Sequence, residues 1–352
     1  MKNYNVIGIM SGTSLDGIDI ALCSFHLLKN KWEYKIVKAE TYQYTNIWKK
    51  RLTELPKSNA LKFVETNIEY GKLLGETINK FLNTYNLKAD FISSHGHTIF
   101  HQPDKHITSQ IGDGATIAAI TGIDVICNFR TMDVALSGQG APLVPIGDEL
   151  LFSDYDICIN LGGFSNISFK KNNIRIAFDI CPCNIILNYL SNKLNKPFDD
   201  KGKIACSGKC NTKLLNQLNN IDYYKKSYPK SLSREWLENN FIPLIDDYNI
   251  DICDKLNTVT EHIATQISKY TNIKDNLKIL ITGGGAKNDY LIKKLKAKTK
   301  NTIIIPDNIV IDYKESLIFA FLGVLRKEEQ INCLKSVTGA IKDNTGGCIY
   351  KA

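Results

Sequence analysis

The sequence predicts an α/β protein made of two similar domains, because its two halves repeat one pattern of strands and helices. Each half opens with three strand-like apolar segments and continues with alternating strand and helix signals. A run rich in glycine and proline, 137–145, interrupts the pattern between the halves. We therefore expect two α/β domains, each a mixed sheet with helices, around a central cleft. The expected boundaries are 1–135 plus 335–352 for the first domain and 136–334 for the second.

Short apolar runs bounded by turn residues predict the strands, and longer segments between them predict the helices. Ligands of such sheets collect at the turns that follow the strands. In the first half the expected strands are 5–10, 18–25, 32–41, 90–94 and 124–127, and the expected helices are 60–85 and 113–121. In the second half we expect strands at 156–160, 166–169, 174–178, 277–282 and 302–305, with helices over 256–270, from the glycines at 283–285 to 298, and over 313–327.

Composition argues against several classes of protein. The chain has 352 residues, of which 43% are hydrophobic and 23% charged, with a formal net charge of +8. No run approaches the ~20 apolar residues of a membrane helix, and the first residues lack the long apolar core of a signal peptide. We therefore expect a cytoplasmic protein with ten reduced cysteines and no membrane partner. The densest lysine cluster, 293–300, ends a predicted helix, where cations suit the helix dipole, so we expect no nucleic-acid partner.

Three glycine-rich turns, each directly after a predicted strand, indicate nucleotide binding. Backbone N–H groups in the first two turns can form concavities for phosphate groups, and glycines in the third allow a close approach to the nucleoside. Ligand-free tight turns are the alternative for each turn alone. A phosphate held on a β-hairpin is typical of the actin/hexokinase-like fold and not of the P-loop fold. The candidate residues are Gly12, Thr13, Ser14, Leu15, Asp16, Gly17, Ile18 and Asp19 in the first turn, Gly162, Gly163 and Asn166 in the second, and Gly283, Gly284, Gly285 and Asn288 in the third.

Three charged residues are candidates for the chemistry at the cleft. Asp179 follows a predicted strand at a turn with proline, where a general base belongs, although capping of the next helix explains it equally well. Arg130 also follows a strand and is a candidate for a bidentate contact to a substrate carboxylate, with an ion pair to Asp133 as the equal alternative. Glu315 opens a predicted helix, and it either interacts with the helix dipole or accepts hydrogen bonds from sugar hydroxyl groups.

Histidines and cysteines form two candidate metal sites, and we expect neither to hold a metal. His95, His97 and His101 have the spacing H-x-H-x-x-x-H, and H-x-H occurs in metal-dependent hydrolases. The acidic partner expected beside the last histidine is absent, because Gln-Pro follows it, so hydrogen bonding in the cleft is the favoured role. Cys181 and Cys183, with the cysteines at 206 and 210, offer four thiols, but neither spacing is the usual C-x-x-C.

Together, these motifs resemble those of the anhydro-N-acetylmuramic acid kinase family from one end of the chain to the other. The segments at 8–19 and 138–145 are the most specific to that family. The resemblance implies an actin/hexokinase-like (ribonuclease H-like) fold with two domains, a homodimer and a cytoplasmic location. The matching segments are 8–19, Ser-His-Gly-His-Thr at 94–98, Gln-Ile-Gly-Asp at 110–113, Ser-Gly-Gln-Gly-Ala-Pro-Leu-Val-Pro at 137–145, Asn-Leu-Gly-Gly at 160–163, Phe-Asp at 178–179, Gly-Gly-Gly-Ala-Lys-Asn at 283–288 and Ser-Val-Thr-Gly-Ala at 336–340.

The reaction that the resemblance implies couples hydrolysis to phosphoryl transfer. The substrate is 1,6-anhydro-N-acetylmuramic acid, and the cofactors are ATP and Mg²⁺. Water attacks carbon 1 with inversion while oxygen 6 leaves and takes the γ-phosphoryl group, which gives N-acetylmuramic acid 6-phosphate in cell-wall (peptidoglycan) recycling and amino-sugar catabolism. The resemblance assigns the base to Asp179, which takes the proton of water. By resemblance or position, His95, Thr98, Arg130 and Glu315 are the expected sugar contacts.

The chain departs from the family pattern directly after the expected base. The family usually continues with Thr-Gly-Pro-Gly-Asn, whereas this chain has Ile-Cys-Pro-Cys-Asn at 180–184. A glycine often provides a positive φ or a close approach, so Cys181 and Cys183 are expected to change the shape of the loop and the affinity for the sugar. Two alternatives stay open: a non-catalytic sugar or nucleotide sensor of the same fold, and a metal-dependent hydrolase that uses the three histidines.

Overall fold

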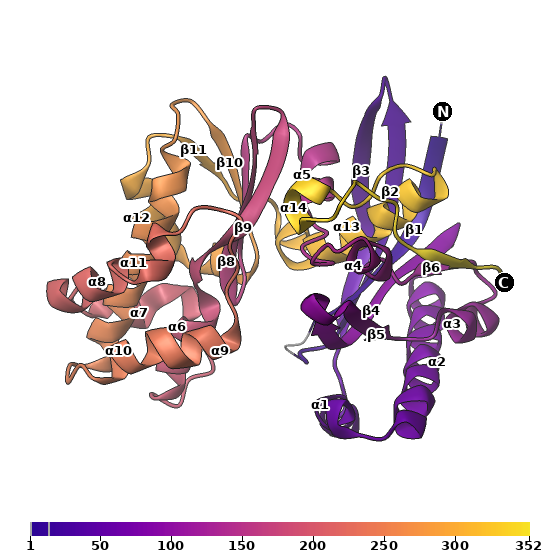
Figure 1. The fold of residues 1–352 in the computed structure, drawn as a ribbon, viewed down its shortest axis with the longest axis horizontal. Helices are drawn as coiled ribbons and strands as arrows, with labels where there is room; N and C mark the ends of the chain where they lie inside the picture. Colours follow the sequence, from indigo (N-terminus) through magenta and orange to yellow (C-terminus); the bar gives the residue numbers. More distant parts are fainter. Residues whose placement is uncertain (1, 13–14) are drawn as a thin grey trace. The chain divides into compact units, whose positions relative to one another are not determined.

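The computed structural model describes residues 2–12 and 15–352, and the chain divides into two compact units. Unit 1 comprises Met1–Leu151 and Tyr313–Ala352, and unit 2 comprises Phe152–Asp312. The prediction of two α/β domains is confirmed, because each unit has its own mixed sheet with helices packed against it (Figure 1). The division differs from the expected one, since the segments 136–151 and 313–334 belong to unit 1.

The sheet of unit 1 combines an antiparallel meander with parallel strands. β1 lies inside the sheet, where it pairs antiparallel with β2 and parallel with β4. The strand order is β12-β6-β4-β1-β2-β3, and β5 pairs with β4. The strands are β1 (Lys2–Ser11), β2 (Ile18–Leu28), β3 (Lys31–Tyr42), β4 (Phe91–Gln102), β5 (Ile107–Ile111), β6 (Val125–Cys127) and β12 (Cys348–Tyr350). The helices are α1 (Asn46–Glu54), α2 (Ala60–Tyr85), α3 (Gly114–Thr121), α4 (Thr131–Ala135), α5 (Pro145–Leu150) and α14 (Lys335–Thr338), with most of α13 (Asn308–Lys327).

Helix α2 begins and ends where the sequence supplies caps, and its predicted bounds are confirmed. The side chain of Asn59 accepts a hydrogen bond from the first turn, and Asn86 adopts a left-handed φ of 50° after the last turn. Leu74, Ile78 and Phe81 recur at helical spacing and are fully buried. These side chains join one core with apolar residues of β1, β2 and β4.

Close backbone packing explains why α5 and α13 belong to unit 1. A Cβ added to Gly147 of α5 would lie 2.6 Å from Ile318 Cγ1 of α13. A Cβ added to Gly8 of β1 would lie 2.0 Å from the backbone oxygen of Ser316. Only glycine permits these approaches. The glycine- and proline-rich run that suggested a domain junction therefore lies inside unit 1.

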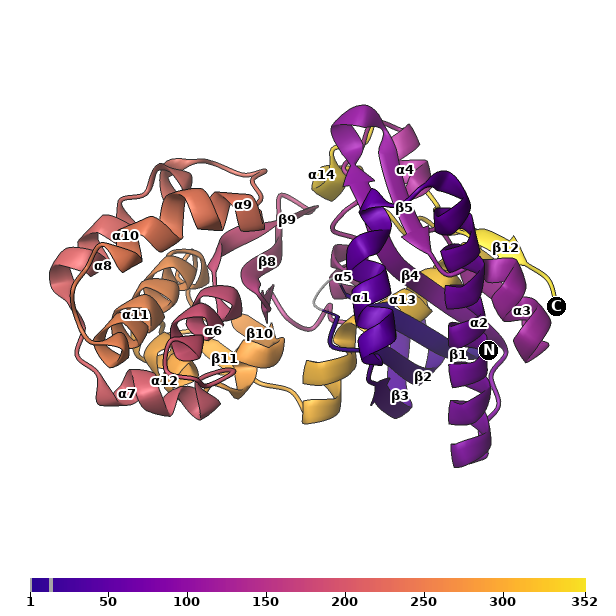
Figure 2. The ribbon, with the colours of Figure 1, turned by 90° about the horizontal axis from the view of Figure 1, so that it is seen from below.

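Unit 2 repeats the strand plan of unit 1. β7, β8 and β9 form an antiparallel meander, and β10 and β11 continue the sheet in parallel beyond β7, in the order β11-β10-β7-β8-β9. Helices α6, α7 and α8 gather around α11, which buries Leu256, Val259 and Ile263 (Figure 2). The strands are β7 (Ile157–Leu161), β8 (Phe164–Lys171), β9 (Ile174–Pro182), β10 (Lys278–Thr282) and β11 (Thr302–Ile304). The helices are α6 (Asn184–Asn192), α7 (Lys203–Ser207), α8 (Thr212–Asn219), α9 (Arg234–Trp236), α10 (Ile242–Asp246), α11 (Ile252–Thr271) and α12 (Asp289–Lys298).

Two of the strands that run further than the sequence predicted carry candidate residues for the site. β4 continues to Gln102, so His95 and His97 lie inside the strand and not at its end. β9 continues to Pro182, so Asp179 also lies inside a strand, and the alternative that it caps the next helix is wrong because α6 has its N-cap at Cys183. The added residues of both strands include polar ones, so no hydrophobic pattern predicts that the strands continue. Backbone pairing with a neighbouring strand forms these extensions.

Replacing Gly8 by alanine should destabilise unit 1 by about 3 kcal/mol, because the new Cβ would overlap a backbone atom of α13 that moves only with its helix. The matched control is Gly163→Ala, where the nearest atom to the new Cβ would be 3.8 Å away. Urea unfolding measures both variants. Equal midpoints for Gly8→Ala and the wild type would contradict the packing of β1 on α13.

Candidate functional site

Asp179 lies at a β-bulge near the end of β9. Asn166 of β8 is opposite Asp179, whereas its neighbour Ser165 is opposite Cys181, so Ile180 is the extra residue. A bulge bends its strand and redirects the side chains that follow. Here Ile180 and Cys181 both enter the core of unit 2, while Asp179 stays half-buried and accessible to solvent.

A loop segment from elsewhere in unit 2 fixes Asp179 on three sides. The Asp179 N–H donates to the carbonyl oxygen of Lys230 at 3.2 Å, and the Tyr223 hydroxyl donates to the Asp179 carbonyl at 2.6 Å. The Leu232 N–H donates to Oδ2 of the carboxylate at 2.9 Å. Desolvation raises the pKa of the Asp179 carboxyl, and the hydrogen bond from Leu232 opposes that rise. An oriented carboxylate with a raised pKa is suited to accept a proton.

Cys181 and Cys183 are core residues, and Cys183 has unusual backbone angles, with φ −129° and ψ −105°. Both side chains are 0% exposed, and neither residue has a positive φ. Burial raises the pKa of the Cys181 thiol to about 12, so this thiol is neutral near pH 7. The expected effect of the two cysteines on the shape of the loop and on the affinity for the sugar stays a prediction, and the ψ of −105° at Cys183 is a conformation that glycine adopts more readily.

The second and third glycine turns meet at one end of the sheet in unit 2, because they follow the parallel neighbours β7 and β10. Gly283 has a φ of 80°, and a Cβ there would lie 2.4 Å from Asn160 Oδ1. A Cβ at Gly285 would lie 2.7 Å from Leu161 Cβ. The packing of the two turns against each other thus requires glycine at both positions.

The remaining predicted residues of these turns have local structural contacts. The carbonyl groups of Gly162 and Gly163 accept hydrogen bonds from the first turn of α6 and the residue before it. A Cβ at Gly284 would meet no atom nearer than 3.6 Å, so space remains beside this residue. Asn288 caps α12, where its Oδ1 accepts the Leu291 N–H at 3.0 Å. The amide of Asn288 is thereby engaged in holding the helix.

The first glycine turn joins β1 to β2 in unit 1. Its predicted residues Thr13 and Ser14 lie outside the described residues. The Leu15 N–H donates to the Gly12 carbonyl at 3.3 Å, and Leu15 adopts a φ of 58°. Gly17 has a φ of 156°, and a Cβ there would lie 2.8 Å from the carbonyl oxygen of Tyr42 in β3. The turn is therefore closed by the backbone and held against the neighbouring strand.

Carboxylates gather near this first turn. Asp16 is exposed and Asp19 is half-buried, whereas the side chain of Ile18 between them enters the core. The Thr41 hydroxyl donates to Asp19 Oδ1 at 2.6 Å. Desolvation and the charges of both aspartates raise the pKa of Glu315. Glu315 is exposed and lies in the first turn of the part of α13 that follows the break at Tyr313, which agrees with the predicted opening of a helix there.

His95 and Arg130 form a hydrogen-bonded pair in unit 1, and the charge of Arg130 acts on Glu315. Arg130 Nε donates to His95 Nε2 at 3.0 Å, and its Nη1 donates to the Gly140 carbonyl at 2.7 Å. His95 must then carry its proton on Nδ1, which lies 2.9 Å from the Gly96 carbonyl. Desolvation and the charge of Arg130 hold the pKa of His95 well below its usual range, so the ring is neutral. The charge of Arg130 also lowers the pKa of Glu315.

Asp133 does not form the ion pair with Arg130 that the sequence offered as an alternative. Within the described residues, Oδ1 of its buried carboxylate accepts from Thr338 Oγ1 at 2.8 Å and from Asn344 Nδ2 at 2.9 Å. Its Oδ2 accepts the Gly140 N–H at 2.8 Å. The forked contact from Arg130 to a substrate carboxylate stays a prediction, because Nε and one N–H of Nη1 are engaged while the second N–H of Nη1 and those of Nη2 remain for it.

The other polar residues predicted in β4 make separate contacts. Thr98 Oγ1 accepts a hydrogen bond from a glutamine of β5 at 3.3 Å. His97 Nδ1 lies 2.8 Å from Ser11 Oγ, and desolvation lowers the pKa of His97 to about 4. His101 Nδ1 lies 3.1 Å from Thr108 Oγ1. In the part of the chain that the structure describes, no group of three or more histidine, cysteine, aspartate or glutamate side chains is arranged to hold a metal ion.

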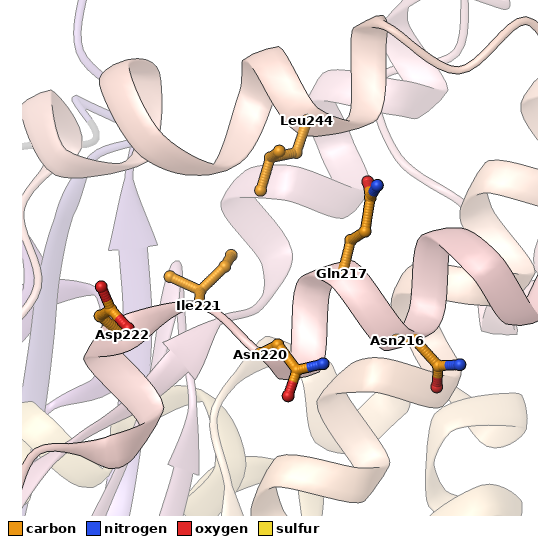
Figure 3. Close-up of a pocket in the computed structure, with 6 residues that line it drawn as sticks. All are labelled: Asn216, Gln217, Asn220, Ile221, Asp222 and Leu244. Atoms are coloured by element: carbon orange, nitrogen blue, oxygen red, sulfur yellow. The ribbon is translucent and has the colours of Figure 1, made fainter.

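Two surface pockets differ in their relation to these residues. A pocket of about 250 Å³ in unit 1 is lined by His95, Gln110 and Asp113 among others. A pocket of about 420 Å³ on unit 2 takes its lining from α8, α10 and the segment between 220 and 222 (Figure 3). Only the first of these two contains a residue that the sequence predicted for a site. The second is lined by Asn216, Gln217, Asn220, Ile221, Asp222 and Leu244.

Comparison with known sequences identifies one family over nearly the whole chain. The family model for anhydro-N-acetylmuramic acid kinase matches residues 4–352. The anhydro-N-acetylmuramic acid kinase of Coxiella burnetii (strain RSA 493 / Nine Mile phase I) is 35% identical over 371 residues, which cover 99% of this chain and 98% of the relative. That of Aliivibrio fischeri is 33% identical over 372 residues and covers 100% of both chains.

Comparison with solved structures gives distant similarities. Component A of (R)-2-hydroxyglutaryl-CoA dehydratase from Acidaminococcus fermentans matches with a TM-score of 0.47 and 13% identity, over 90% of this chain and 96% of that chain. A ROK family glucokinase from Streptomyces griseus, in complex with glucose and AMPPNP, matches with a TM-score of 0.40 and 9% identity. That match covers 90% of this chain and 98% of the glucokinase.

Replacing Asp179 by asparagine should stabilise unit 2 at neutral pH. The native state holds the pKa of this carboxyl above the ordinary 3.8, so it binds the proton more tightly than the unfolded chain does. The free energy of unfolding therefore falls as the pH rises through that pKa. Asparagine does not ionise, so the variant does not lose this stability. The thermal midpoint of Asp179→Asn should exceed that of the wild type at pH 7, and the difference should vanish below the ordinary pKa of aspartate. A lower midpoint at pH 7 would contradict the desolvation of this side chain.

Proposed function

The chain belongs to the anhydro-N-acetylmuramic acid kinase family, and from this premise we propose that Asp179 is the general base of its reaction. The protein is an ATP-dependent sugar kinase that opens 1,6-anhydro-N-acetylmuramic acid by hydrolysis and phosphorylates it to N-acetylmuramic acid 6-phosphate. Water adds to carbon 1, the bond between carbon 1 and oxygen 6 breaks, and oxygen 6 takes the γ-phosphoryl group of ATP.

The setting of the Asp179 carboxylate is the observation that carries this proposal. Water is a poor nucleophile, so a base must take its proton as the new bond to carbon 1 forms. The hydrogen bond from Leu232 to Oδ2 orients the carboxylate, and desolvation raises its pKa and hence its affinity for the proton. With Asp179 on the side opposite to the departing oxygen 6, the reaction inverts carbon 1, as in inverting glycosidases.

The sugar contacts proposed in unit 1 are His95, Thr98, Arg130 and Glu315. Arg130 uses Nε and one N–H of Nη1 for its two bonds, while Nη2 donates to no described residue, so we assign the carboxylate of the substrate to Nη2 and the second N–H of Nη1. The exposed carboxylate of Glu315 suits the role of acceptor for a sugar hydroxyl group. Neutral His95 holds Arg130 in place for this contact.

The nucleotide is assigned to the three glycine turns. The backbone N–H groups of the turns at 12–19 and 162–163 suit the phosphates, and the absence of side chains at 283–285 suits the close approach of the nucleoside. Asp16 and Asp19 fit Mg²⁺, because this ion binds through one or two carboxylates together with substrate phosphates. Mg²⁺, when bound, neutralises charge that develops on the transferred phosphoryl group.

The cellular setting that we propose is a cytoplasmic homodimer in cell-wall recycling and amino-sugar catabolism. Consumption of ATP supports the cytoplasm, and the muramic acid substrate, a sugar of peptidoglycan, supports the role in recycling. The dimer rests on the family resemblance and can be measured by sedimentation. None of the described helices is long and apolar enough to cross a membrane.

The variant Asp179→Asn should lose turnover by about 10³-fold while ATP still binds, because an amide cannot take the proton of water. Turnover is measured as ADP and sugar phosphate formed together, and ATP binding by calorimetry. The control is Asp222→Asn, a change at an exposed aspartate of the same unit. Full activity of Asp179→Asn would refute the assignment of the base.

Restoring the family's two glycines, with Cys181→Gly and Cys183→Gly together, should leave the turnover number unchanged. It should cost about 2 kcal/mol of stability, because two buried side chains are lost and the backbone gains freedom in the unfolded state. Urea unfolding and steady-state kinetics measure the two effects, with Cys206→Ser as an exposed control. A large gain in turnover would show that the cysteines distort the site.

A further inference from the structure

A buried ion pair joins α5 to α13 in unit 1. Lys314 Nζ lies 2.7 Å from Asp148 Oδ1, and the two side chains are only 6% and 4% exposed. The pair between Lys193 and Asp246 on unit 2 is by contrast a surface pair, with side chains 34% and 36% exposed. Solvent screens the surface pair, whereas the buried pair is screened much less.

The buried pair lies close to both places where the chain passes from one unit to the other. One crossing is at 151–152, three residues after Asp148, and the other is at 312–313, directly before Lys314. The second crossing coincides with a break in α13, because Tyr313 has non-helical angles of φ −119° and ψ 16°. The ion pair therefore connects the unit 1 ends of both crossings.

The pair also fixes the short part of α13 that carries Glu315. Beyond that residue α13 is held by packing, since Ser316 lies against β1 and Ile318 lies against Gly147 of α5. Before it, the helix is broken at Tyr313. Lys314 is buried and the adjacent Glu315 is exposed, so anchoring the first of these side chains sets where the second one lies.

Stability alone does not account for a buried pair of this kind. Two charges lose their hydration on burial, and apolar side chains of similar volume often serve stability equally well or better. What an ion pair adds is one defined arrangement of its partners. The charge of Lys314 also lowers the pKa of Glu315, together with the larger effect of Arg130.

We propose that the Asp148–Lys314 ion pair is a positioning element of the reaction, which holds Glu315 in place for the sugar and anchors both chain crossings on unit 1. This inference rests on the proposed sugar contact of Glu315. Neither Asp148 nor Lys314 is assigned a contact with the substrate, so both act through the backbone that they hold.

The test replaces the pair by apolar residues, with Asp148→Leu and Lys314→Met in one variant. Its urea midpoint should equal or exceed that of the wild type. Amide hydrogen exchange over 312–318 should become about tenfold faster, because the broken turn loses its anchor. The turnover number should fall about tenfold while the KM for ATP stays unchanged, because Glu315 alone is misplaced.

The matched control removes the surface pair with Lys193→Met and Asp246→Leu, and should change none of these readouts. If amide exchange over 312–318 is as slow in the apolar variant as in the wild type, the proposal is overturned, whether or not the sugar is phosphorylated. Faster exchange with a full turnover number would overturn it too, because the pair would then hold the chain without serving the reaction. A wild-type enzyme that fails to phosphorylate the sugar would instead refute the proposed function. Should the double variant not fold, Asp148→Asn, which keeps the shape of the side chain, carries the same exchange and kinetic readouts.

Discussion

The buried carboxylate of Asp133 holds together the segments that carry the proposed sugar contacts His95 and Arg130. It accepts hydrogen bonds from side chains of the C-terminal segment 333–344 and from the N–H of Gly140. Burial of a carboxylate without such donors is costly, so these segments are constrained to meet at this point. Gly140 in turn accepts from Arg130, which donates to His95. One continuous set of hydrogen bonds thus leads from the core to the proposed sugar contacts.

Hydrophobic patterning predicted an element best where its apolar face is long and capping residues mark its ends. Helix α2 has the predicted bounds, because caps at both ends and a regular buried stripe act together. Patterning failed at β4 and β9, where polar residues such as His95 and Asp179 continue a strand through backbone pairing alone. The domain boundary also differs from the expected one. Contacts at glycines, such as that of Gly8 with α13, place α13 in unit 1, and such tertiary contacts have no local sequence pattern.

Motifs predicted candidate residues for the site, but they did not predict the partners that hold these residues. Asp179 was predicted from its place after an apolar run, whereas Tyr223 in a short 3-10 helix and Leu232 in a loop, which fix it, lie in segments without a recognisable pattern. Arg130 was likewise predicted, but its bonds to His95 and Gly140 were not. Contacts of this kind join segments far apart in the sequence. In the sequence each partner is a single polar residue, which is equally consistent with an ordinary surface residue.

The fate of the oxygen of water tests the proposed reaction most directly. Purified protein is incubated with Mg-ATP and 1,6-anhydro-N-acetylmuramic acid in ¹⁸O-water, and the products are followed by mass spectrometry. Hydrolytic opening coupled to phosphorylation predicts N-acetylmuramic acid 6-phosphate with one ¹⁸O at carbon 1, formed in equal amount with ADP. Binding of ATP without any sugar phosphate, or sugar phosphate that lacks the label at carbon 1, would contradict it.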